Sequence, residues 1–143
     1  MERKAFLRSL GAGAAFALTF PCLQGCSGDG SEGAQEEVPT GVDFTIDLSG
    51  PDGADLAGNG DFIIRNEVVV ARNLEGNFVA ASRICSHQQN PGVSFVSDQG
   101  GIFECYVHGS QFSQDGTPLN AVTRNPLKIF RTSLNAELLR VYE

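Results

Sequence analysis

Residues 85–112 read CSHQQNPGVSFVSDQGGIFECYVHGSQF. The chain has only two histidines, and both lie in this stretch, as Cys85-Ser86-His87 and Cys105-Tyr106-Val107-His108. The two Cys–His pairs bracket the residues from Gln88 to Glu104. Within that interval, apolar runs at 93–96 and 102–105 flank a polar, glycine-rich turn, which predicts two short strands joined by a turn.

The sequence on either side of this stretch also predicts strands. Residues 42–48 alternate apolar and polar side chains, the period of a strand with one buried face. Further short apolar runs, separated by turn residues, lie at 62–65, 68–71, 78–81, 127–130 and 138–142. No stretch after residue 40 has helical periodicity, and no repeat or nucleotide-binding glycine motif is present. We therefore expect an all-β fold of about nine strands over residues 42–143, a small antiparallel sandwich or barrel.

Residues 1–25 are typical of a signal peptide. Arg3, Lys4 and Arg8 precede an apolar run at 10–23, which is shorter than the roughly 20 residues that span a bilayer. The run 3–8 looks like a twin-arginine export motif with lysine in the second place. Leu23-Gln24-Gly25-Cys26 resembles the lipobox of bacterial lipoproteins. A plain secretory signal peptide is the alternative for both motifs.

These motifs predict where the protein acts. The lipobox resemblance implies that Cys26 is lipidated and that the protein is anchored to a membrane of the cell envelope, on the periplasmic side. Cys22 would be lost with the signal peptide. Residues 26–41 are polar, glycine-rich and acidic, so we expect them to form a flexible tether between the anchor and the folded domain.

The charge of the chain excludes one class of partner. The net charge is −7, and because residues 1–25 carry +2, the remainder carries −9. Nucleic-acid affinity depends on neutralising phosphates, so an acidic domain does not favour such binding. The negative charge favours basic or neutral proteins as partners, bound through salt-sensitive contacts. A role in solubility alone also explains the negative charge.

The residues leave the chemistry of the Cys–His pairs open at this point. Two cysteines in an exported β domain commonly form a disulfide, with the histidines as chance neighbours. Two cysteines and two histidines are also an ordinary ligand set for structural zinc, although zinc fingers commonly pair Cys with Cys and His with His.

The order and spacing of the pairs resemble the Rieske family. Its pattern is Cys-x-His, a spacer, and then Cys-x-x-His-Gly, and both halves match here, as do the later turn residues Gly116, Pro118-Leu119 and Pro126-Leu127. The resemblance implies a Rieske-like domain with a cluster-binding loop subdomain that holds a [2Fe–2S] cluster. It also assigns the ligands: Cys85 and Cys105 bind the inner iron, and His87 and His108 bind the outer, more exposed iron.

Departures from the pattern indicate the branch of the family. Respiratory Rieske subunits link their loops by a disulfide, but Asn90 and Val107 occupy those two positions here. Those subunits also use a serine and a tyrosine as hydrogen-bond donors to the cluster and cysteine sulfurs. Ser110 is retained as a cofactor-binding residue, whereas Phe112 replaces the tyrosine. Such hydrogen bonds raise the reduction potential, so we expect a value below that of the respiratory subunits.

The resemblance implies electron transfer. We expect a carrier or the small redox subunit of a cell-envelope oxidoreductase, working with redox partner proteins of the envelope. Oxygenases of the family need a separate mononuclear iron domain, which residues 42–143 are too few to hold. The alternative from another class is a lipoprotein whose disulfide-stapled β domain binds a partner without redox chemistry. A ferredoxin that serves an oxygenase is a third hypothesis, and the export signal argues against it.

Overall fold

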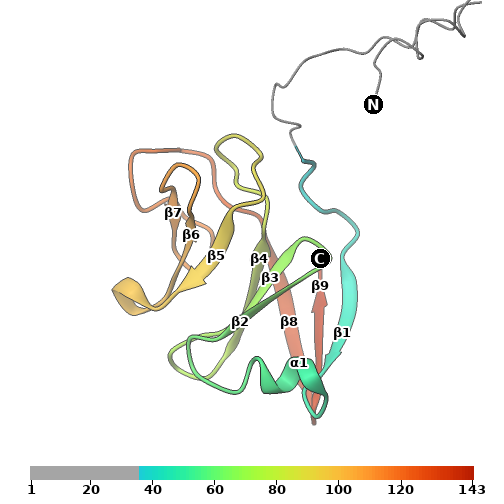
Figure 1. The fold of residues 1–143 in the computed structure, drawn as a ribbon. Coiled ribbons are helices and arrows are strands. Elements are labelled where there is room, and N and C mark those ends of the chain that lie inside the picture. Colours follow the sequence, from blue (N-terminus) through green and yellow to red (C-terminus); the bar gives the residue numbers. More distant parts are fainter. Residues whose placement is uncertain (1–35) are drawn as a thin grey trace, which may run out of the picture. The chain divides into compact units, whose positions relative to one another are not determined.

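The computed structural model describes residues 36–143 (Figure 1). The predicted signal peptide, the Cys26 lipidation site and tether residues 26–35 lie outside the described residues. Across the described part of the chain, no helix is long and apolar enough to cross a membrane. The elements are β1 (Asp43–Asp47), α1 (Pro51–Ala54), β2 (Phe62–Arg65), β3 (Val68–Arg72), β4 (Phe78–Ser82), β5 (Val93–Val96), the 3₁₀ turn η2 (Asp98–Gly100), β6 (Ile102–Cys105), β7 (Gln111–Phe112), β8 (Ile129–Asn135) and β9 (Leu138–Tyr142).

The strands form two antiparallel sheets, which confirms the all-β prediction. One sheet has six strands in the order β1-β9-β8-β4-β3-β2, and the other has three in the order β5-β6-β7. Strand β8 joins the two halves of the larger sheet, because Ile129 and Phe130 pair with β4 while the rest of the strand pairs with β9. The larger sheet can therefore curl around a core.

Strand β3 is buried on both faces because it lies between two cores. Its residues 68–71 are fully buried. Val68 and Val70 pack with Ile46, Leu139 and other residues inside the curled sheet. The alternate residues Val69 and Ala71 face a second core, against the three-stranded sheet. A continuous run of apolar residues, rather than alternation, is what such a strand requires.

The second core supports the loops that carry the Cys–His pairs. Phe103 and Phe112 are fully buried in it, and Phe95 packs edge-on against Phe103, with ring centroids 5.5 Å apart. Cys85 and Cys105 belong to the same hydrophobic core. Aromatic packing of this kind places the two cysteines on a rigid base.

The structure differs from the sequence-based expectation at three places. Strand β8 begins at Ile129 and runs to Asn135, later and longer than the predicted 127–130, because its second half is exposed and has no apolar pattern. Strand β7 has two residues, too few to show a period. A single helical turn, α1, starts with Pro51 in its first turn, a position where the missing N–H costs no hydrogen bond.

Candidate metal centre

The first cysteine–histidine loop, residues 85–92, is a closed turn between β4 and β5. The Cys85 N–H donates to the Asn90 carbonyl at 2.8 Å, and the Gln89 N–H donates to the Cys85 carbonyl at 2.9 Å. Gln89 adopts a left-handed backbone with φ of 52°. These hydrogen bonds fix Cys85 at the start of the loop. His87 lies two residues later, within the turn that they close.

The second loop, residues 105–112, repeats this geometry. The Cys105 N–H donates to the Ser110 carbonyl, and the Gly109 N–H donates to the Cys105 carbonyl, both at 2.9 Å. Gly109 occupies the position that corresponds to Gln89 and has φ of +74°. Nothing lies within 4 Å of a Cβ built on Gly109, so the backbone angle explains the glycine in this structure. The two loops are joined by the Tyr106 N–H, which donates to the Gly92 carbonyl at 3.1 Å.

The four predicted ligands form two pairs, one of histidines and one of cysteines. The imidazole centroids of His87 and His108 lie 4.9 Å apart, with the rings at 81° to one another. Cys85 and Cys105 are free cysteines with exposed fractions of 1% and 0%. Among the described residues, no three His, Cys, Asp or Glu side chains converge to hold a single metal ion.

Electrostatics at Cys105 favour a neutral thiol when no metal is bound. Burial is the largest effect and raises the pKa of the Cys105 thiol, and the neighbouring Cys85 thiol raises it further. Hydrogen bonding from the backbone N–H groups of Val107 and His108 acts in the opposite direction and lowers the pKa of Cys105. The same two N–H groups would stabilise a thiolate once a metal ion replaced the proton.

Two buried polar atoms in these loops have no partner. Three buried side-chain nitrogen or oxygen atoms lack a hydrogen bond in residues 36–143, and two of them are Nδ1 of His87 and Oγ of Ser110. A buried polar atom without a partner is costly, and native proteins rarely leave one. Both atoms are therefore free to contact a bound group, the nitrogen as a metal ligand and the hydroxyl as a hydrogen-bond donor.

A third loop, residues 117–127, braces the other two. The Asn120 side chain donates to the Gly109 carbonyl at 2.7 Å, and Asn125 exchanges hydrogen bonds with Ser86 in the first loop. Gly116 closes this loop: its φ is +88°, and a Cβ there would lie 2.4 Å from the Leu127 carbonyl oxygen. The predicted turn at Gly116 is confirmed, whereas the two asparagines were missed because an isolated asparagine in a loop predicts only a turn.

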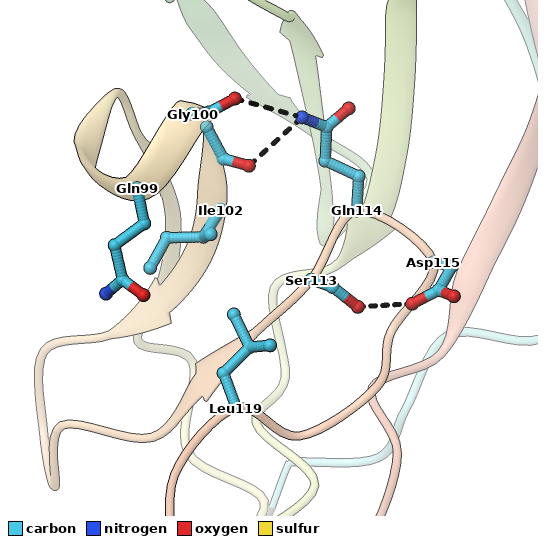
Figure 2. Close-up of a pocket in the computed structure, with 8 residues that line it drawn as sticks. Gln99, Gly100, Ile102, Ser113, Gln114, Asp115 and Leu119 are labelled. Carbon is cyan, nitrogen blue, oxygen red and sulfur yellow. Dashed lines mark hydrogen bonds between the residues drawn. The ribbon is translucent and has the colours of Figure 1, made fainter.

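A surface pocket of the described domain is lined by residues other than these ligands. It is formed between η2, β6 and residues 113–119, and none of the four predicted ligands lines it. Figure 2 shows its polar lining already engaged: the Gln114 amide donates to the carbonyls of Gly100 and Gly101, and Ser113 donates to Asp115. The pocket therefore offers few free polar groups to a ligand, and the loops are the better candidate site.

Comparison with known families agrees with the loop geometry. A family model described as the Rieske [2Fe–2S] domain matches residues 32–131. The chain belongs to the Rieske family. Its cofactor is accordingly a [2Fe–2S] cluster, and the donor set of two thiols and two imidazoles in separate pairs fits a dinuclear cluster in which each iron takes two protein ligands. No curated protein matches the sequence.

One solved structure shows the same fold at low identity. The ferredoxin of carbazole 1,9a-dioxygenase from Nocardioides aromaticivorans IC177 is 20% identical to this Rieske protein, with a TM-score of 0.50, over 74% of this chain and 98% of the ferredoxin. The quaternary ammonium Rieske monooxygenase CntA is 19% identical, with a TM-score of 0.47, over 63% of this chain. The match spans about 30% of that monooxygenase.

The cysteines and the histidines of the Rieske protein are expected to bind different irons of the cluster. We expect Cys85 and Cys105 to hold the inner iron on the buried side, where Phe103 and Phe112 exclude water. His87 and His108 would hold the outer iron. That assignment of individual ligands stays a prediction, and it is supported by the pairing of the side chains and by the unpartnered Nδ1 of His87.

We predict that Ser110→Ala lowers the reduction potential without loss of the cluster. The buried hydroxyl has no other partner, and a hydrogen bond to a cluster sulfur strengthens when the cluster gains negative charge. A difference of about 1–2 kcal/mol corresponds to roughly 40–90 mV for one electron. Protein-film voltammetry measures the shift. Ser86→Ala is the matched control, because the Ser86 hydroxyl already donates to the Asn125 carbonyl; an equal shift in both variants would contradict the prediction.

We predict that Gly92→Ala weakens cluster retention. A Cβ on Gly92 would lie 2.8 Å from Cγ2 of Val107 and 3.1 Å from the Cys105 sulfur, so the second loop would have to move. Iron loss to a chelator, followed by the fading visible absorbance, should be several-fold faster than in the wild type. Ser94→Ala, in the adjoining strand β5, is the control. Unchanged retention in Gly92→Ala would show that the contact does not position Cys105.

Proposed function

We propose that this Rieske protein transfers electrons as a membrane-anchored carrier, or as the small redox subunit of an oxidoreductase, in the cell envelope. The observation that carries the proposal is the unequal exposure of the ligands. Both cysteines are buried, His87 is half-buried and His108 is exposed. The histidine side of the site therefore reaches the surface, where a redox partner can approach within electron-transfer distance.

The chemistry of such a site is one-electron transfer. The cluster supplies two stable redox states, and replacing two thiolates by imidazoles places the potential of Rieske centres at about −150 to +300 mV. Within the chain, Cys85 and Cys105 would bind as thiolates, and hydrogen bonding from the Val107 and His108 backbone N–H groups would stabilise the negative charge on Cys105.

The cell-envelope location is supported by the sequence of residues 1–26. The basic segment, the apolar run and the lipobox-like Leu23–Cys26 together favour export and lipidation. A twin-arginine route carries folded proteins, which suits a domain whose cluster is assembled before export.

Cell fractionation tests this proposal. The full-length protein should be found in the membrane fraction, and Cys26→Ser should move to the soluble envelope fraction while keeping its visible absorbance. Cys22→Ser is the matched control, because Cys22 would be removed with the signal peptide. A red-brown protein found in the cytoplasm for all three chains would contradict the envelope proposal and favour a ferredoxin that serves a cytoplasmic oxygenase.

The disulfide alternative finds no support in the geometry. Cys85 and Cys105 are both free, and the buried Ser110 hydroxyl and His87 Nδ1 have no hydrogen-bond partner. A purely structural disulfide would leave both of those buried atoms without a partner. A colourless, iron-free protein with a Cys85–Cys105 bond would nevertheless restore that alternative.

A further inference from the structure

Strand β2 forms an outer edge of the six-stranded sheet. It is the last strand in the sheet order, and among residues 36–143 only β3 pairs with it. The Arg72 N–H, at the end of β3, donates to the Asp61 carbonyl at 2.9 Å, just before β2 begins. Residues of an antiparallel strand direct their N–H and C=O groups alternately toward and away from the partner strand. The odd-numbered residues of β2 therefore face β3, whereas the backbone groups of Phe62 and Ile64 face outward.

The outward-facing residues of this edge have exposed apolar side chains. Phe62 is 37% exposed, and Ile64 is 43% exposed. The same alternation, fixed by the hydrogen bond from the Glu143 N–H to the Val42 carbonyl, applies to strand β1 at the other edge of the sheet. The residues of β1 that face away from β9 are Asp43, Thr45 and Asp47. Charged residues on an edge strand oppose pairing with another chain, so β1 is protected in this way and β2 is not.

The order of residues along β2 makes this edge complementary to a second copy of itself. Two β2 strands that pair antiparallel about Ile63 place Phe62 of each copy opposite Ile64 of the other copy. Because these residues have the outward-facing N–H and C=O groups, each of the two pairs can exchange two hydrogen bonds. Each pair also joins an aromatic with a β-branched side chain, a favourable combination across antiparallel strands. The exposed apolar side chains of the two copies would thereby cover one another.

The charged residues beside the apolar pairs match in the same register. Asp61 of each copy lies opposite Arg65 of the other copy. Within its own chain, Arg65 forms an ion pair with Asp52, and its side chain is still 40% exposed. One carboxylate oxygen of Asp61 accepts a hydrogen bond from the Gly58 N–H at 2.7 Å, which leaves the second oxygen for another donor. A shift of the pairing by two residues would lose both charge pairs, so the sequence favours one register.

We propose that β2 is a dimerisation edge, through which two copies of this chain pair antiparallel about Ile63 and join their six-stranded sheets. The interface is isologous, because the same residues of both copies form it. None of the four predicted cluster ligands lies in β2, so the proposal does not depend on the proposed electron-transfer function. A four-residue strand makes a small interface, and we therefore expect a weak dimer that forms with increasing concentration.

Sedimentation equilibrium of the full-length, cluster-containing protein tests the dimer, with Cys26→Ser in every sample to keep the chain free of lipid. Over roughly 1 µM to 1 mM protein, the average mass should rise from one chain toward two. Ile64→Lys should lower the association constant about tenfold or more, because a charge would be buried opposite Phe62. Leu134→Lys is the matched control, because Leu134 is also exposed but lies in β8, away from this edge. The control should associate like the parent protein.

An exchange of charges tests the register. Asp61→Arg and Arg65→Asp each place like charges opposite one another, so each should weaken association severalfold. The double variant restores opposite charges between the copies and should recover most of the association. It does not restore the contacts with Gly58 and Asp52 inside each chain, so recovery can arise only between chains. Circular dichroism confirms that the variants are folded, and a folded double variant without recovery would overturn the proposed pairing.

Amide hydrogen exchange, measured by nuclear magnetic resonance, tests whether the contact lies at β2. The N–H groups of Phe62 and Ile64 should exchange rapidly in dilute protein and become protected as the dimer forms. A chain that stays monomeric at the highest concentration would overturn the proposal. So would a dimer in which both amides stay unprotected, because another surface would then form it. Protection of both amides in a monomer would assign the edge to a segment of the same chain and would also overturn the proposal.

Discussion

Purified Cys105→Ser protein is expected to contain at most about a tenth of the wild-type iron, because changes beyond the ligands already cost 10–100-fold in metal affinity and loss of a ligand costs more. Cys105 is fully buried beside Cys85. Cys85 is the only other cysteine among residues 36–143, and it is itself a predicted ligand. Iron analysis and the visible spectrum measure the loss.

Tyr106→Ala is the matched control for Cys105→Ser. Tyr106 lies next to Cys105 in the same loop, but its side chain is 77% exposed and is not a predicted ligand. The control variant should keep its iron and colour. Circular dichroism of both variants separates loss of the cluster from loss of the fold. Full iron content in Cys105→Ser would remove Cys105 from the ligand set.

Phe103→Ala is expected to lower the free energy of unfolding by about 3–5 kcal/mol, the usual cost of deleting a fully buried phenylalanine. Phe103 is completely buried in β6 and packs edge-on against Phe95. It shares a core with both cysteines, so the variant should also release iron faster. Urea denaturation of the variant, monitored by circular dichroism, gives the stability.

Leu134→Ala provides the matched control for the core substitution. Leu134 is an apolar residue of strand β8 that is 53% exposed, and exposed substitutions usually change stability by less than about 0.5 kcal/mol. Similar losses in the two variants would show that the second core does not support the cluster loops in the way proposed.

The sequence predicts the fold best where burial leaves a pattern. Strands β1 and β3 were predicted to within one residue, because one alternates between core and solvent and the other is a continuous apolar run between two cores. The exposed half of β8 and the two-residue β7 have neither pattern, so periodicity could not find them. The same limit applies to α1, a single turn with no buried residue.

For the candidate site, the sequence predicts the ligands, an assignment that stays a prediction, but not the contacts that support them. The Cys–His spacings singled out Cys85, His87, Cys105 and His108, and the structure brings them together as two pairs. Spacing alone does not show the hydrogen bonds from Asn120 and Asn125, or the contact of Gly92 with Cys105, because they join residues far apart in the chain. The Glu36–Gln89 hydrogen bond is another example: composition predicts a flexible segment there, and a single backbone contact leaves no sequence signal.

The central claim is that two cysteines and two histidines hold a [2Fe–2S] cluster, and electron paramagnetic resonance of the dithionite-reduced protein tests it most directly. Removing Cys26 gives a soluble sample for this purpose. The account predicts the rhombic signal of a reduced [2Fe–2S] centre with mixed histidine and cysteine ligation, lost in Cys105→Ser. A silent, colourless and iron-free sample after anaerobic preparation, with Cys85 and Cys105 joined in a disulfide, would contradict it.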